Sequence, residues 1–184
     1  KYKYQTSTLK PQQQFYSKTS LGPGRVGLQN IGNTCYFNSA LQCIMHSMPF
    51  VVYLLGPNWK KDINTRNPIG TGGALVTAFQ KVLKSIWTGD ASSITPTDLK
   101  YAIGKHAQQF QGHAQHDAHE LLMFMLDGIH EDLKRILKKP YIKDVTGDGG
   151  NDCEIAQQSW NRHLQINNSI VVDVFHGLLR NQLF

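Results

Sequence analysis

Residues 27–48, GLQNIGNTCYFNSALQCIMHSM, place a cysteine between a run of small polar residues and an apolar stripe. Asn33 or Thr34 can cap the first turn of a helix, and Pro49 is expected to stop that helix. Cys35 is therefore predicted at the N-terminal end of a helix, where the helix dipole favours a thiolate. The apolar residues that predict the helix recur at steps of three and four: Tyr36, Phe37, Ala40, Leu41, Ile44, Met45 and Met48.

The number and spacing of the cysteines indicate the compartment. Cys35, Cys43 and Cys153 form no CxxC pair, and three is an odd number. This pattern argues against a disulfide framework and favours a reducing compartment, so the cytoplasm or the nucleus is expected. A lone cysteine more often serves packing than chemistry, so helix position alone does not establish a nucleophile.

Length and composition indicate one domain or part of one. The chain has 184 residues, of which 40% are hydrophobic and 17% are charged. It begins at Lys1 and stops inside the apolar run RNQLF, so both ends are expected to be cut from a longer protein. No apolar run reaches the roughly 18 residues that span a bilayer, so no membrane partner is expected.

The charge is basic, at +6 from 19 basic and 13 acidic residues. Part of this excess lies in residues 1–25, which are predicted to form a polar basic arm. No basic stripe with interleaved aromatic residues occurs on a predicted helix, so no nucleic-acid partner is expected.

Hydrophobic periodicity predicts further helices at residues 75–86, 96–103, 117–138 and 156–164. The third begins at TPTD with Thr95 as its cap and Pro96 in its first turn, and Gly104 is expected to end it. The β-branched run SIVVDVF from residue 169 predicts a strand at which a sheet begins. The chain is therefore predicted to be α+β, a helical lobe that leads into a β region.

Three stretches occur in the order typical of the ubiquitin-specific proteases and resemble that family. They are GLQNIGNTCYFNSALQCI, GHAQHDAHELLMFMLDGIHEDL at residues 112–133, and AQQSWNRHLQINNSIVVDVFHGLL near the end. The segment ITPTDLKYAIGKHAQQFQG, before the second stretch, is similar as well. The resemblance implies a papain-like cysteine protease fold. Residues 26–165 would form the helical thumb lobe, and residues 166–184 the truncated start of the palm and fingers sheet.

The resemblance also implies a function, that of a deubiquitinating thiol protease acting on ubiquitin and ubiquitinated proteins. Cys35 would attack the carbonyl at the ubiquitin C-terminus and form an acyl-enzyme. Asn30 and the backbone N–H of Cys35 would donate hydrogen bonds to the oxyanion. Without the resemblance, Asn30 reads as an ordinary turn residue.

Asp117 and Glu120 form a D-x-x-E pattern before an apolar helix, which is compatible with a purely structural capping box. The resemblance implies that these carboxylates meet arginines on the flexible tail of ubiquitin, which guanidinium groups can bind in a bidentate manner. It implies that Gln115 positions backbone near the catalytic cleft. It assigns no catalytic role to His116 or His119.

A metal site is the competing interpretation of the histidine-rich stretch. His113, His116 and His119 are followed by Glu120, and neighbouring imidazoles commonly bind zinc. Each step of three residues along a helix turns by about 300°, so the outer two histidines would point about 120° apart. This geometry disfavours a metal site.

The family's histidine box, which supplies the catalytic base, has no counterpart in these residues. The resemblance therefore implies that this chain is the nucleophile half, inactive alone, and that the other half is present in cis or as a second chain. No cofactor is expected here, although cysteine pairs for structural zinc could follow Phe184. The alternative function is a non-catalytic ubiquitin-binding or scaffold module on the same fold.

Overall fold

The computed structural model describes residues 22–138, 140–142 and 151–180, so most of the predicted basic arm lies outside the described residues. The described helices and strands are β1 (Gly27–Leu28), α1 (Cys35–Met45), α2 (Met48–Leu55), the 3-10 helix η1 (Trp59–Asp62), α3 (Ala74–Thr88), β2 (Ser93–Ile94), α4 (Thr97–His106), the 3-10 helix η2 (Gln108–Phe110), α5 (Ala118–Asp132), α6 (Asp152–Ile166) and α7 (Ile170–Phe175).

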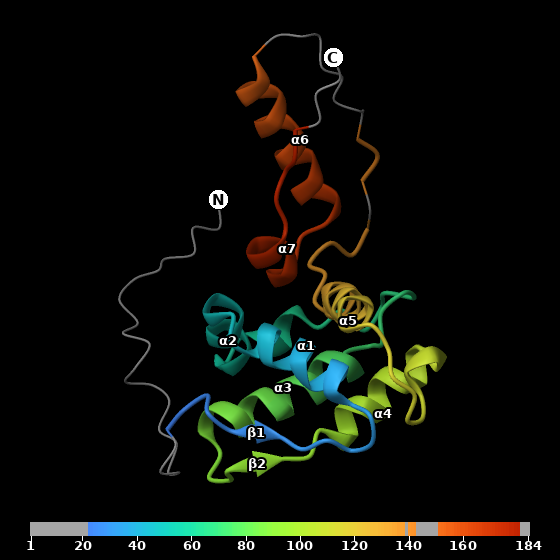
Figure 1. The fold of residues 1–184 in the computed structure, drawn as a ribbon. Helices are drawn as coiled ribbons and strands as arrows, with labels where there is room; N and C mark the ends of the chain where they lie inside the picture. The colour runs from blue at the N-terminus through green and yellow to red at the C-terminus, as the bar shows by residue number, and fades with distance from the viewer. Residues whose placement is uncertain (1–21, 139, 143–150, 181–184) are drawn as a thin grey trace.

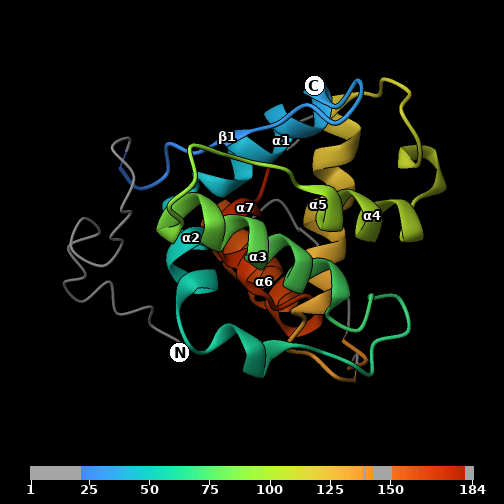
Figure 2. The same cartoon turned by 90° about the horizontal axis from the view of Figure 1, so that it is seen from below.

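The helices form one lobe, with α1, α3 and α5 at its centre and α2 and α4 on opposite sides of α3 (Figures 1 and 2). Strands β1 and β2 are parallel, and Gly27 pairs with Ser93. This pairing fixes the segment before α1 against the segment before α4. Helices α7 and α6 extend from one side of the lobe (Figure 1).

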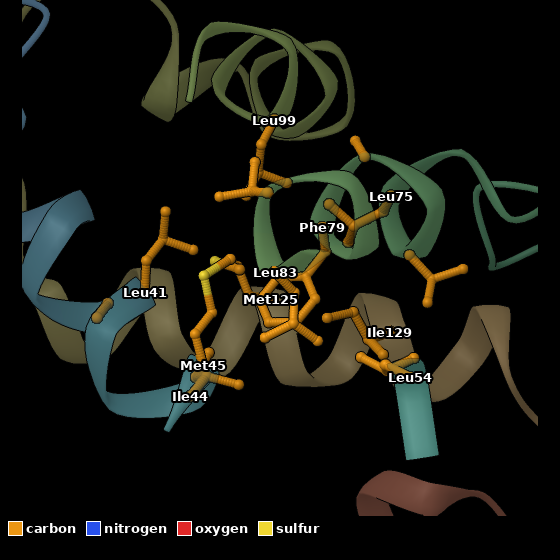
Figure 3. Close-up of a cluster of buried hydrophobic side chains, with 14 of the residues drawn as sticks. Leu41, Ile44, Met45, Leu54, Leu75, Phe79, Leu83, Leu99, Met125 and Ile129 are labelled. Carbon is orange, nitrogen blue, oxygen red and sulfur yellow. The ribbon is translucent and has the colours of Figure 1, made fainter. Parts of the chain in front are cut away.

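The core lies where α1, α3, α4 and α5 meet. Figure 3 shows side chains from all four helices converging. Eight of the labelled side chains from these helices are fully buried: Leu41, Met45, Leu75, Phe79, Leu83, Leu99, Met125 and Ile129. Full burial of one such side chain contributes about 1.5–3 kcal/mol. The predicted apolar faces of the first four helices are thus confirmed as the faces that form the core.

The first helix ends where a break was predicted, but the role of the proline differs. Helix α1 stops at Met45, and Pro49 lies in the first turn of α2. A proline is tolerated there because the first-turn N–H has no intrahelical acceptor. Thr34 occupies the N-cap position of α1 without capping it. Its hydroxyl instead accepts a hydrogen bond from Ile31 N and donates one to Asn30 Oδ1.

Two predicted helix boundaries were wrong because of long-range contacts. Helix α4 runs past Gly104 to His106, and the buried Gly104 packs against Gln111. Helix α5 ends at Asp132 rather than at Lys138. There the Asp132 carbonyl accepts from Asn64 N, and the chain then turns so that Arg135 N donates to the Asn168 carbonyl.

The strand predicted from residue 169 was also wrong, because residues Ile170–Phe175 form the helix α7. The Ser169 hydroxyl caps this helix by accepting from Val172 N at 3.3 Å. Ile170, Val171 and Val172 are all buried, against α2 and α5. An N-cap and burial of three successive residues outweigh the β preference of branched side chains.

Asp132 joins the end of α5 to the start of α3. Its fully buried carboxylate accepts hydrogen bonds from Thr71 N and Thr71 Oγ1, both at 2.7 Å, and from Gly73 N and Val76 N, both at 3.2 Å. Gly73, the N-cap residue of α3, has no side chain to cap the helix. Asp132 therefore supplies from another helix the anionic cap that the α3 N-terminus favours.

We expect Asp132→Ala to lower the free energy of unfolding by about 3 kcal/mol or more, because it leaves buried donors without an acceptor. Asp127→Ala, at an exposed position of the same helix, should change that free energy by less than about 0.5 kcal/mol. Urea denaturation of the chain followed by circular dichroism measures both variants. Equal losses in the two variants would show that Asp132 is not a special constraint.

Candidate active site

The loop before α1 is organised around the carboxamide oxygen of Asn30. Asn30 Oδ1 accepts from Gly32 N at 3.0 Å and from Thr34 N and Thr34 Oγ1, both at 3.1 Å. Thr34 is fully buried, which anchors this network. Asn30 Nδ2 has no hydrogen-bond partner among the described residues, so its two N–H groups remain available to a ligand.

Cys35 is the first residue of α1, as predicted, and its side chain is exposed. As a first-turn residue, it presents a backbone N–H that has no intrahelical acceptor. Asn38, one turn later, donates from Nδ2 to the carbonyls of Leu28 and Gln29, both at 3.2 Å. This contact holds the strand before the loop against the helix that bears the thiol.

The histidine-rich stretch that begins at His113 lies directly beside the cysteine loop. Asn33 Nδ2 donates to the His113 carbonyl at 3.0 Å across 80 residues of sequence. Gly32 has a φ of +107°, and a Cβ there would lie 2.5 Å from His113 Nδ1. A side chain at position 32 would therefore collide with His113 and strain the backbone.

Aromatic packing completes the contact between the two stretches. The ring of His116 lies 5.3 Å from the rings of both Tyr36 and Phe110. Burial, followed by the charge of the adjacent Cys35, raises the pKa of Tyr36, so its phenol stays neutral at neutral pH. His116 thus lies in the wall behind the cysteine helix.

Asp117 and Glu120 are exposed at the start of α5, and each has a local partner. Asp117 is the N-cap residue and accepts from His119 N at 2.7 Å. Glu120 accepts from Gln109 Nε2 at 3.1 Å instead of closing a capping box. Gln115 is exposed and has no hydrogen-bond partner within the described part of the chain. Both carboxylates remain open to a cationic ligand.

The described residues provide an exposed thiol and hydrogen-bond donors but no histidine base bonded to the thiol. Within residues 22–138, 140–142 and 151–180, no histidine forms a hydrogen bond with Cys35. Nor do those residues contain a group of three or more His, Cys, Asp or Glu arranged to hold a metal ion. None of their helices has the length and apolarity needed to cross a membrane.

A separate group of histidines, which the sequence did not predict, joins the last three helices. His163 Nε2 and His176 Nδ1 lie 3.3 Å apart, and His130 Nδ1 contacts Ser169 Oγ at 2.8 Å. Burial lowers the pKa of His130 and of His163, so both are neutral at neutral pH. These histidines connect α5, α6 and α7 and do not contact Cys35.

The sequence of this chain matches a known protein family over most of its length. The family model described as "Ubiquitin carboxyl-terminal hydrolase" matches residues 26–183. "Ubiquitin carboxyl-terminal hydrolase 15" of Homo sapiens is 44% identical over 161 residues, which are 88% of this chain and 16% of that protein. "Putative ubiquitin carboxyl-terminal hydrolase 11" of Arabidopsis thaliana is 43% identical over 160 residues, 87% of this chain and 18% of that protein. The chain thus spans less than a fifth of the length of these relatives.

Two solved structures are similar to the lobe. The structure of "the SAGA Ubp8/Sgf11/Sus1/Sgf73 DUB module bound to ubiquitin aldehyde" matches with a TM-score of 0.51 and 25% identity, over 61% of this chain and 25% of that chain. The module "bound to monoubiquitin" matches with a TM-score of 0.52 and 22% identity, over 65% of this chain and 27% of that chain. These likenesses confirm the predicted fold class, and the described residues form its mainly helical lobe.

Proposed function

The chain belongs to the ubiquitin carboxyl-terminal hydrolase family, and from that premise we propose that it carries the nucleophile of a deubiquitinating cysteine protease. The bond hydrolysed is the isopeptide or peptide bond at the C-terminus of ubiquitin. One observation carries the proposal: the exposed Cys35 opens α1 directly after a loop that holds Asn30 by its carboxamide oxygen. That arrangement leaves the Asn30 N–H groups free to donate.

In the proposed reaction, the Cys35 thiolate attacks the carbonyl carbon of the last ubiquitin residue. The carbonyl π electrons move to oxygen, and the oxyanion accepts hydrogen bonds from Asn30 Nδ2 and the backbone N–H of Cys35. The C–N bond then breaks, and the amine leaves after it takes a proton from a general acid. Water hydrolyses the resulting thioester, which releases the ubiquitin carboxylate and regenerates the thiol.

The general base and acid would come from a histidine outside residues 1–184, in the same polypeptide or in a second chain. The absence of a base beside Cys35 among the described residues supports this division. The chain alone is therefore proposed to be inactive, because an amine is a poor leaving group unless it is protonated. The second half would complete the cleft in which both groups act.

Asp117 and Glu120 are proposed to bind arginines of the ubiquitin tail, with Gln115 positioning nearby backbone. The exposure of both carboxylates beside the cysteine loop supports this role. A similar solved structure is bound to ubiquitin aldehyde, which supports ubiquitin as the ligand of this fold. Asp117 would serve at once as helix cap and as ligand, since a carboxylate can accept several hydrogen bonds.

A non-catalytic ubiquitin-binding module on this fold is the alternative function, favoured only by the missing base. A binding module has no need of an exposed thiol beside a free amide donor. The structure retains both, at Cys35 and Asn30, so the enzymatic proposal stands first.

We expect a ubiquitin that bears a C-terminal electrophile to react with Cys35 alone in the complete catalytic domain. Cys35, Cys43 and Cys153 are all exposed, so accessibility cannot explain such selectivity, whereas placement at the N-terminal end of α1 can. Peptide mapping of the adduct by mass spectrometry decides the matter, with Cys35→Ala as the control. An adduct on Cys43 or Cys153 would refute the assignment.

Asn30→Asp should separate the two tasks of the Asn30 side chain. An aspartate keeps an oxygen for the three loop donors but removes the N–H groups, so kcat should fall by about 10² to 10³ while the Tm changes little. Asn30→Ala should lower both kcat and the Tm because the loop donors lose their acceptor. Wild-type kcat in Asn30→Asp, measured on a ubiquitin C-terminal amide, would reduce Asn30 to a turn residue.

Asp117→Asn and Glu120→Gln together should raise KM for ubiquitin substrates by about three- to tenfold through the loss of two exposed charge pairs. The Tm should stay constant because asparagine also caps a helix. Asp117→Ala should lower stability by about 1 kcal/mol in addition. Steady-state kinetics and thermal unfolding measure the two effects, and unchanged KM in the paired variant would leave Asp117 a purely structural cap.

A further inference from the structure

A hollow of about 580 Å³ opens next to the cysteine loop and is not used by the proposed reaction. It lies between α4 and residues 110–113, and the cysteine loop closes one end through Ile31. Lys100, Tyr101 and Lys105 line it from α4. A volume between about 300 and 1,000 Å³ is typical of a ligand site.

Hydrogen bonds hold the walls of this hollow in place. Lys100 Nζ donates to the Phe110 carbonyl at 3.2 Å, and Gln111 Nε2 donates to the Gly104 carbonyl at 2.8 Å. A Cβ at Gly104 would lie only 3.0 Å from Gln111 Cγ, so the loop approaches α4 as closely as a glycine allows. The hollow is therefore formed before any ligand binds, which lowers the entropic cost of binding.

The lining is cationic and carries no compensating acid. Lys100 and Lys105 both border the hollow, and no lining residue is Asp or Glu. In the part of the chain that the structure describes, neither lysine forms an ion pair. Asp98 is the acidic residue nearest to Lys100 in the sequence, and it does not line the hollow. Glu120 accepts a hydrogen bond from Gln109. Burial lowers the pKa of Lys100, so a carboxylate beside it would offset a desolvation cost already present.

The positions of the two lysines indicate how an acidic ligand could lie across α4. Five residues along α4 correspond to a rise of about 7.5 Å and a turn of about 140°, so Lys100 and Lys105 point in different directions around the helix. Tyr101, which is 75% exposed, stands between the lysines as an aromatic contact surface. An extended segment with several acidic residues that crosses α4 over Tyr101 can place a carboxylate beside each lysine.

The hollow and the carboxylates that face the ubiquitin tail belong to different surfaces of the site. Asp117 and Glu120 lie at the start of α5, whereas the hollow follows α4. An isopeptide substrate sends two chains away from the scissile bond, the ubiquitin tail and the modified protein. We propose, on the basis of the function proposed above, that this hollow binds an acidic segment of the modified protein, beyond the bond that Cys35 attacks.

The test uses the complete catalytic domain and three substrates. Two are ubiquitin joined through an isopeptide bond to a lysine peptide, with Asp and Glu at alternate positions in one and Asn and Gln in the other. The third is ubiquitin with a small C-terminal fluorophore, which does not reach the hollow. The wild type should hydrolyse the acidic conjugate with a kcat/KM about three- to tenfold above the neutral one at low salt, and this ratio should fall as salt rises.

Charge reversal locates the effect. Lys100→Glu with Lys105→Glu should abolish or invert the ratio while leaving the fluorophore substrate unchanged. Lys81→Glu with Lys84→Glu, on exposed positions of α3, makes the same change in net charge and should keep the ratio. Lys100 also donates a hydrogen bond to the Phe110 carbonyl, so its replacement can disturb the wall of the hollow. The single variant Lys105→Glu avoids this effect and should still lower the ratio of the two kcat/KM values.

The outcomes are separable from those of the proposed function. A wild-type ratio of one, or a ratio lost equally in the α3 control, would overturn the inference. Failure of the wild type to hydrolyse even the fluorophore substrate would count against the protease function alone. Fluorescence anisotropy would then still measure binding of the labelled acidic peptide to the hollow. This binding should weaken in Lys105→Glu and should be absent for the neutral peptide.

Discussion

The buried carboxylate of Asp132 is the constraint on which the arrangement of this lobe depends. It accepts four hydrogen bonds from the segment that opens α3, and it sits in the last turn of α5. Burying a charge is costly unless hydrogen bonds replace the lost water, so the two helices are held in one relative position. Helix α1 packs on α5 and α4 packs on α3. The place where the cysteine loop meets α4 follows from that position.

Local sequence predicted the interior of the helices well and their ends poorly. The apolar faces of α1, α3 and α5, and the position of Cys35 at a helix start, follow from periodicity and from nearby polar residues. The end of α5 and the helical state of α7 depend on partners distant in sequence. One example is the hydrogen bond from Arg135 N to the Asn168 carbonyl, which joins segments 33 residues apart. The hydrophobic periodicity of neither segment predicts this bond.

For the site, the sequence suggested which residues matter, but it did not show which of their atoms are engaged in hydrogen bonds. The family resemblance suggested Asn30 as an oxyanion donor. The structure adds that Asn30 Oδ1 accepts hydrogen bonds from three donors, whereas Nδ2 has no partner among the described residues. Asp117 was open to two interpretations, and the contact with His119 N establishes the capping one without excluding a ligand role. The hollow beside Ile31 could not be predicted, since its wall comes from three separate segments brought together by folding.

The segment between η2 and α5 connects both charged surfaces to the loop that bears Cys35. Its His113 carbonyl holds Asn33 of the cysteine loop, and its Gln111 side chain holds α4. Screening at physiological ionic strength acts over about 8 Å, so exposed charges on the two surfaces influence mainly the chain that each one contacts. Under the proposals made above, a rigid connection with short-range charges would let the carboxylates bind the ubiquitin tail and the lysines bind the modified protein independently. A change in the sequence that one surface binds would then leave the affinity of the other surface unchanged.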